Sequence, residues 1–203
     1  RGLVHYELEI NGKAVRPQTV QSFILMPEEE TLSDFKVAFA SCMNTIRVPL
    51  QPIWTQVAIF RPDALFLIGD NNYMPMRPSA YEAPESTVKF ALGRYHRYLR
   101  DVPGLRSVLA TTPTYGVWDD HDFGPNNSDR TFKWRDLSLD LFKKYWPNPG
   151  AGTAETAGIF HSFRISDVEF FMMDESMVVR SPMVTLGPII ELRISQPAPM
   201  RTG

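Results

Sequence analysis

The chain has 203 residues, of which 43% are hydrophobic and 22% charged, a composition typical of a globular protein with a buried core. The 21 Lys and Arg against 23 Asp and Glu give a formal net charge of −2, which argues against the basic surface of a nucleic-acid-binding protein. No run approaches the roughly 20 apolar residues of a membrane-spanning helix. The single cysteine, Cys42, excludes an intramolecular disulfide.

The N-terminal segment predicts β-structure. Strand-like runs cover residues 3–10 and 21–26, and the first is followed by Asn11-Gly12, a strong signal for a tight turn. An acidic loop at 28–30 comes next. These strands are either the tail of a small β domain or an edge ribbon.

From Phe35 onward, predicted strands and helices alternate. Strands are expected at 35–40, 64–68 and 115–118, helices at 53–60, 87–101 and 135–145, and a hairpin at 159–165 and 168–173. This order predicts an α/β fold with an at least partly parallel sheet. The continuous apolar run Ala64–Ile68 indicates a strand buried on both faces.

Each of the three predicted strands ends in a polar cluster, and sites in open α/β sheets form at the carboxyl ends of strands. Asp70 and Tyr73 follow the second strand. A carboxylate is a hard oxygen ligand that can bridge two cations, and a phenolate suits ferric iron. The alternative is an ordinary strand-end turn with a solvated Asp70 and a packed Tyr73.

The cluster Asp119-Asp120-His121-Asp122 follows the third strand and concentrates negative charge, which is costly unless cations neutralise it. Histidine is also the usual general acid near neutral pH. The alternative is an acidic turn with a surface histidine.

In the next loop, Asn126 and Asn127 could offer amide oxygens to a metal or only stabilise turns, and Arg130 could clamp an anionic oxygen or be solvated. Cys42, after the first strand, is either a ligand or a small buried hydrophobe.

Taken in order, three motifs resemble the PhoD-like alkaline phosphatase family of the calcineurin-like metallophosphoesterases. They are Phe39-Ala-Ser-Cys42, Gly69-Asp-Asn-Asn-Tyr73 and Trp118-Asp-Asp-His-Asp-Phe-Gly-Pro-Asn126. The resemblance implies a metallophosphatase-like sandwich of mixed β-sheets flanked by helices over residues 34–203. It also implies that residues 1–33 are the end of a small N-terminal β-sandwich domain.

The resemblance further implies a two-metal site. Cys42 as thiolate and Tyr73 as phenolate would bind ferric iron, and Asp70 would bridge to a second metal, calcium in some members. Asp120 and Asn126 would bind on that second side. Other divalent metals are compatible with these ligand types.

The activity implied is hydrolysis of a small phosphate ester by a metal-activated water. Asp120 and His121 would be the catalytic residues, with His121 stabilising the transition state or protonating the leaving oxygen. Asn127 and Arg130 are candidates for substrate binding. Family members are commonly exported, so the resemblance implies an extracellular or periplasmic location.

Two features depart from the family pattern. Members run well beyond this length and supply further Asp or His ligands from their C-terminal half, so the sequence looks truncated at both ends, starting at Arg1 rather than Met. A helix is expected near Leu186, but residues 189–200 carry no helical stripe. We therefore expect a lost reading frame near Pro188 or a split gene. A non-catalytic remnant and a metal-binding or interaction module without hydrolysis remain alternatives, and the oligomeric state is left open.

Overall fold

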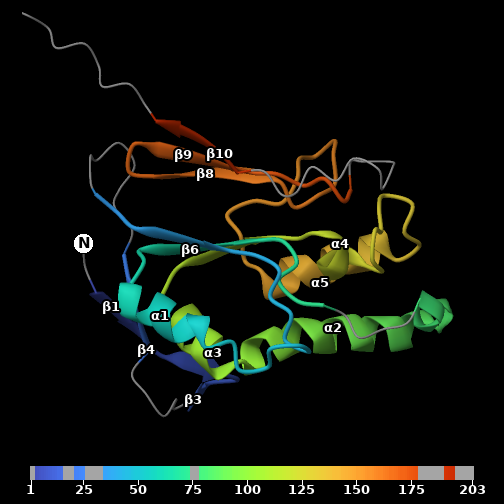
Figure 1. Ribbon diagram of the computed structural model, residues 1–203, viewed down its shortest axis with the longest axis horizontal. Helices are drawn as coiled ribbons and strands as arrows, with labels where there is room; N and C mark the ends of the chain where they lie inside the picture. Colours follow the sequence, from blue (N-terminus) through green and yellow to red (C-terminus); the bar gives the residue numbers. More distant parts are fainter. Residues whose placement is uncertain (1–2, 16–20, 26–33, 74–77, 178–189, 195–203) are drawn as a thin grey trace, which may run out of the picture.

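The computed structural model describes residues 3–15, 21–25, 34–73, 78–177 and 190–194, and its main body is built in layers (Figure 1). The middle layer is a parallel sheet of β5 (Val37–Ala40), β6 (Ala64–Ile68) and β7 (Thr114–Val117), in that order. An antiparallel sheet of β8 (His161–Ile165), β9 (Val168–Met172) and β10 (Ile190–Ile194) lies on one side, and helices lie on the other. The predicted mixed α/β fold with a parallel sheet and flanking helices is confirmed.

Aromatic rings join the two sheets. The ring of Phe66, on the central strand β6, lies 4.8 Å from that of Phe170 on β9 and 5.9 Å from that of Phe163 on β8. Side chains alternate along a strand, so the neighbours Leu65 and Leu67 point to the helical layer. All three β6 residues are fully buried, as the apolar run predicted.

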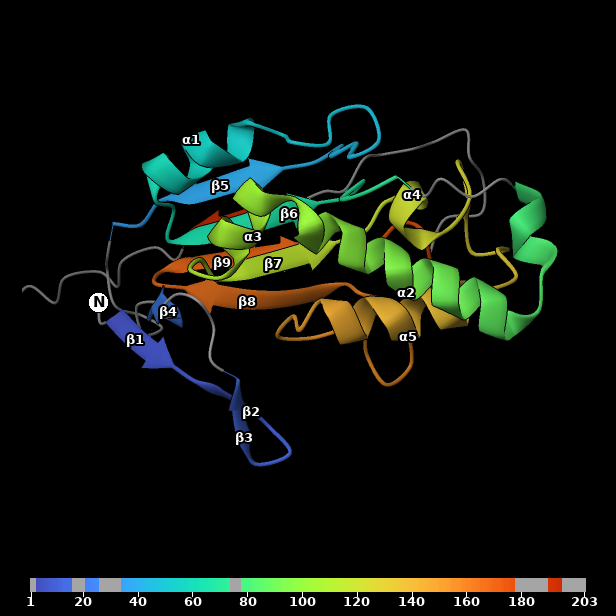
Figure 2. The ribbon, with the colours of Figure 1, turned by 90° about the horizontal axis from the view of Figure 1, so that it is seen from below.

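The helices α1 (Ile53–Phe60) and α5 (Arg135–Tyr145) have the predicted boundaries, and α2 (Glu85–Asp101) begins two residues earlier than predicted. Figure 2 shows α3 in front of the sheets, with α1 and α5 at opposite edges of the view. Helix α3 (Pro103–Leu109), the short helix α4 (Asp120–Phe123) and a 3-10 turn at Pro78–Glu82 were not predicted. Proline at the first position of α3 starts a new helix directly after α2.

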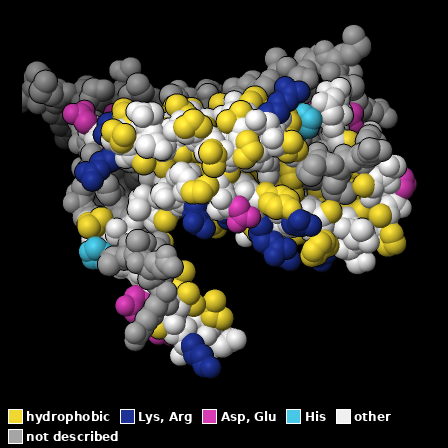
Figure 3. All heavy atoms as spheres, turned by 60° about the horizontal axis from the view of Figure 1, so that its bottom comes forward, with side chains coloured by type: hydrophobic (Ala, Val, Ile, Leu, Met, Phe, Trp, Pro, Cys, Tyr) yellow, Lys and Arg dark blue, Asp and Glu magenta, His cyan; other side chains and the backbone are white. Residues whose placement is uncertain are grey.

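The N-terminal residues form two small ribbons. β1 (Leu3–Tyr6) pairs with β4 (Gln21–Ile24), and β2 (Leu8–Ile10) pairs with β3 (Lys13–Val15), both antiparallel. The expected turn is confirmed, with positive φ at both Asn11 and Gly12. The expected single strand over 3–10 was wrong, because it breaks into β1 and β2, and β3 was missed. The β2–β3 hairpin projects from the body (Figure 2) and exposes apolar side chains (Figure 3).

The C-terminal tail contains one described element. β10 pairs with β9 from Ile190 opposite Met172 to Ile194 opposite Val168. The sequence predicted no strand there, and the helix expected near Leu186 lies outside the described residues, as do 195–203. Within the part of the chain that the structure describes, no helix combines the length and apolarity that crossing a membrane requires.

The stacked rings predict where stability resides. Replacing Phe66→Ala removes a fully buried ring that contacts both sheets, and we expect it to lower the free energy of unfolding by about 3–5 kcal/mol in chemical denaturation. Phe90→Ala is the control, because Phe90 on α2 is 63% exposed and should change the same quantity by less than about 0.5 kcal/mol. Equal losses for both variants would contradict the placement of the core.

Candidate metal centre

The carboxyl ends of β5, β6 and β7 bring three loops to one edge of the parallel sheet. The loop after β5 is held directly against the loop after β6. The amide of Cys42 donates to the carbonyl of Gly69 at 3.3 Å, and the amide of Met43 donates to the carbonyl of Asp70 at 2.8 Å. Residues far apart in the sequence are therefore fixed side by side by main-chain bonds.

Asp122 ties the loop after β6 to the segment after β7. One carboxylate oxygen of this buried residue accepts from the amide of Asn71 at 3.0 Å and from the amide of Asp119 at 3.2 Å. The other oxygen accepts from the amide of Asn72 at 3.2 Å. The side chain of Asn71 also donates to Asp122 at 3.2 Å and to the carbonyl of Val117 at 2.7 Å. Asp122 and Asn71 thus hold the framework and are not exposed ligands.

The segment after β7, for which an acidic turn was the alternative interpretation, is a short helix. Asp119 caps α4, and its side chain accepts the amide of Asp120 at 2.7 Å, while Asp122 accepts the amide of Asp119 in return. Of the four side chains at positions 119–122, those of Asp119 and Asp122 form this capping box and so have a structural role. It leaves Asp120 and His121 to face the neighbouring loop.

Three of the predicted site residues converge there. Ligand atoms of Asp70, Asp120 and His121 all lie within 4.8 Å of one another. Asp70 is only 9% exposed, so the alternative of a solvated Asp70 was wrong, and its Oδ1 has no hydrogen-bond partner among the described residues. A buried acceptor without a donor is costly, and a cation would satisfy it.

Tyr73 joins this cluster to Cys42. Its hydroxyl hydrogen-bonds the side chains of Asp70 and Cys42, and its ring centroid lies 4.4 Å from that of His121. Cys42 is exposed, so the alternative of a small buried hydrophobe was wrong. Burial, with the hydrogen bond and negative charge of Asp70, raises the pKa of Tyr73, so the phenolate needs a cation beside it.

The electrostatics also favour a cation. Burial raises the pKa of Asp70; the Tyr73 hydroxyl and His121 oppose the rise, and the charges of Asp119 and Asp120 add to it. Burial likewise raises the pKa of Asp119. A metal ion would offset both the desolvation and the repulsion, and carboxylate, imidazole, thiolate and phenolate are all metal donors. The donor set therefore fits a bound metal.

The loop 124–130 approaches the cluster through its backbone. The amide of Asn127 donates to the carboxylate of Asp120, and Asn126 and Asn127 are exposed. The carbonyl of Arg130 accepts from the side chain of Arg135 at 2.8 Å. Among the described residues, no hydrogen bond or ion pair joins the side chains of Asn126, Asn127 or Arg130 to the cluster, so their roles stay predictions.

The sequence reasoning missed Glu175, which lies in the loop after β9. Its Oε1 is buried without a hydrogen-bond partner among the described residues. Burial, helped by the negative charges of Asp119 and Asp174, raises the pKa of Glu175 to about 7. Asp174 is fixed by the Trp118 indole N–H at 2.7 Å and by the amide of Ile159 at 2.8 Å. The available signal was a further polar pair, Asp174-Glu175, directly after a predicted strand.

Comparison with known proteins gives one line of similarity. No protein-family model matches the chain, and no curated protein does. Six chains of solved structures match, among them one titled "Structure of PhoD", with a TM-score of 0.66 and 16% sequence identity over 86% of this chain. The match covers 37% of that chain, so this chain spans well under half of its length. The similarity establishes a shared fold.

The raised pKa of Glu175 predicts a pH effect on stability. The folded chain holds this proton to a higher pH than the unfolded chain, so the free energy of unfolding falls as pH rises from about 4.5 to about 7. Glu175→Gln cannot ionise, so it should not lose this part of the stability as pH rises. In the presence of a chelator, we expect the Tm of the variant minus the Tm of the parent to increase between pH 4.5 and pH 7.5. A Tm difference that stays constant across this range would contradict the buried position of Glu175.

Proposed function

We propose that this chain carries the catalytic centre of a metal-dependent phosphoesterase, acting on phosphomonoesters first and phosphodiesters second. The observation that carries the proposal is the convergence of Asp70, Asp120 and His121, where a buried oxygen of Asp70 has no hydrogen-bond partner in the part of the chain that the structure describes. The fold shared with PhoD and the position at the carboxyl ends of parallel strands support it. Because the chain spans only part of that structure, the proposal concerns the chemistry of this centre.

In the proposed centre, Cys42 and Tyr73 would hold ferric iron, and Asp70 would be a ligand of this ion and of a second one, calcium or another divalent metal. Asp120 would hold the second ion together with Asn126, whose loop contacts Asp120 through the Asn127 amide. Bound metals would supply positive charge for the phosphate oxygens and acidify a water for attack on phosphorus. Converging donors, low exposure of Asp70 and the raised carboxyl pKa values favour this ligand set.

His121 is the proposed proton donor to the leaving alcohol oxygen. Its ring is held against Tyr73, and its carbonyl accepts from the Tyr95 hydroxyl at 3.2 Å, so both ends of the residue are positioned. An imidazolium beside the cluster can stabilise negative charge on the leaving oxygen and then release the proton to it. Asn127 and Arg130 would contact the phosphate of a small ester. Export from the cytoplasm is part of the proposal by family resemblance.

The direct test is metal analysis together with hydrolysis of a chromogenic phosphate ester. The chain should retain metal and turn over the ester, and Asp70→Asn should lower kcat/KM by at least about 100-fold with a parallel loss of metal. Asp136→Asn on α5 is the matched control, because that carboxylate is 83% exposed and should leave both unchanged. Metal binding without turnover would favour a metal-binding module, and the absence of both would favour a non-catalytic remnant.

The iron assignment has its own test. A phenolate bound to ferric iron absorbs visible light, so the iron-loaded chain should be coloured. Tyr73→Phe should remove the colour, and Cys42→Ala should lower the iron content by about tenfold or more. Tyr98→Phe removes a hydroxyl from a tyrosine outside the ligand cluster and should preserve both. Unchanged colour and iron content in Tyr73→Phe and Cys42→Ala would show that these residues do not hold iron.

A further inference from the structure

A cavity of about 280 Å³ adjoins the candidate metal centre, between the loop after β5 and helix α2. Two residues that line it, Tyr73 and Tyr95, also contact residues of the metal cluster. Tyr73 hydrogen-bonds Asp70 and its ring lies tilted against that of His121, and the Tyr95 hydroxyl donates to the carbonyl of His121. The cavity and the metal centre therefore share the Tyr73 side chain as a common boundary.

The walls of this cavity are fixed by buried hydrogen bonds. Asn72 is only 2% exposed, and its side-chain oxygen accepts the hydroxyl of Thr45 at 2.9 Å. Its side-chain amide donates to the carbonyl of Tyr95 at 3.0 Å. One residue thus links the loop after β5, the loop after β6 and helix α2. A cavity whose walls are already fixed can bind a ligand without first ordering them.

The lining is aromatic and apolar. Three tyrosines, Tyr73, Tyr95 and Tyr98, share it with aliphatic residues that include Ile46 and Val102. Asp101 is the one charged residue among the described residues that line it. The guanidinium of Arg94 lies over the Tyr98 ring at 5.0 Å but does not belong to the lining. Among the described residues, the lining therefore carries no cationic side chain that would pair with a negative group.

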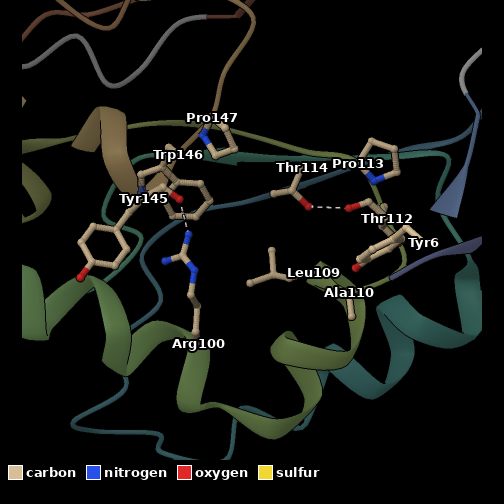
Figure 4. A pocket seen from close by; sticks show the side chains of 10 residues that line it. All are labelled: Tyr6, Arg100, Leu109, Ala110, Thr112, Pro113, Thr114, Tyr145, Trp146 and Pro147. Carbon is tan, nitrogen blue, oxygen red and sulfur yellow. Dashed lines mark hydrogen bonds between the residues drawn. The ribbon is translucent and has the colours of Figure 1, made fainter. Parts of the chain in front are cut away.

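A larger cavity of about 490 Å³ lies at the opposite end of β7 and differs in chemistry (Figure 4). Its lining includes Arg100, which donates to the carbonyl of Tyr145 and lies over the Trp146 ring at 4.9 Å. Because it includes Thr114 at the start of β7, it is remote from the metal centre. Size alone therefore does not identify the cavity that serves the site.

We propose that the smaller cavity holds the alcohol portion of the phosphate ester and selects an aromatic or apolar group without negative charge. This inference rests on the proposed function and names its substrate class. A cavity of roughly 150 Å³ can hold benzene, so 280 Å³ accommodates an aryl group. With the phosphate at the metal centre, the aryl group would lie against Tyr98 and Ile46, and a second phosphate or carboxylate on the alcohol would face Asp101.

The first test compares phenyl phosphate with methyl phosphate. Tyr98→Ala should lower kcat/KM for phenyl phosphate by about fivefold to tenfold while changing the value for methyl phosphate little. The two esters have different leaving groups, so the quantity to compare is the ratio of their kcat/KM values. Dividing this ratio in each variant by the ratio in the parent chain removes the leaving-group effect. Phe90→Ala, an exposed aromatic on the same helix, is the matched control, and Tyr98→Phe should retain the preference. An unchanged ratio in Tyr98→Ala overturns the proposal.

The second test concerns charge. Asp101→Lys should raise kcat/KM for 4-carboxyphenyl phosphate relative to phenyl phosphate by about fivefold, because attraction replaces repulsion across the cavity. Asp136→Lys on α5 makes the same charge change at an exposed site and should leave the ratio unchanged. Equal ratios in the two lysine variants would overturn the exclusion of negative groups.

A binding measurement separates this inference from the proposed function. Phenylphosphonate is not hydrolysed, and calorimetry should show that it binds the chain more tightly than methylphosphonate, with the difference lost in Tyr98→Ala. Turnover of esters with equal binding of both phosphonates leaves the proposed function standing and overturns the cavity's role. Selective phenylphosphonate binding without turnover of any ester supports the cavity and overturns the proposed function.

Discussion

The candidate site depends on one buried carboxylate, that of Asp122. It accepts hydrogen bonds from the amides of Asn71, Asn72 and Asp119, and so joins the ends of β6 and β7. Burial raises its pKa well above the usual range, but those donors oppose the rise. One oxygen accepts from three donors and the other accepts only from the Asn72 amide, so loss of that amide would leave a buried oxygen without a partner among the described residues. The positions of Asp70, Asp120 and His121 follow from this bond set.

The same geometry explains why the acidic residues divide into two groups. Asp119, Asp122 and Asp174 accept hydrogen bonds from the protein, and these bonds stabilise their charge. Asp70 and Glu175 each retain a buried oxygen without a partner among the described residues. A fold that satisfies some carboxylates and leaves others open has a local excess of negative charge, which an incoming cation can neutralise. The hydrogen-bonded carboxylates of Asp119, Asp122 and Asp174 thus add negative charge around the site without being the groups that bind the cation.

Local patterns predicted much of this structure. The apolar run of β6, the helices α1 and α5, and the polar ends of three strands are all encoded by neighbouring residues, so Asp70, Asp120 and His121 could be found before any coordinates. Contacts between residues far apart in the sequence could not be predicted in this way. Asp122 and Asn71 bond across 51 positions, and β10 is a strand because β9 offers it a free edge. Glu175 went unnoticed because its raised pKa comes first from burial in the folded chain and then from the charges of Asp119 and Asp174.

Backbone conformation adds a further consequence. Cys42 and Asp70 both have left-handed dihedral angles, with φ of 57° and 48°, a region that costs a residue with a side chain roughly 1–2 kcal/mol. Glycine would adopt these angles freely, yet it carries no thiol or carboxylate. Any search for stabilising substitutions guided by backbone fit alone would therefore select against the two residues best placed to bind a cation. At this edge of the sheet, thermostability and ligand retention are opposing design goals.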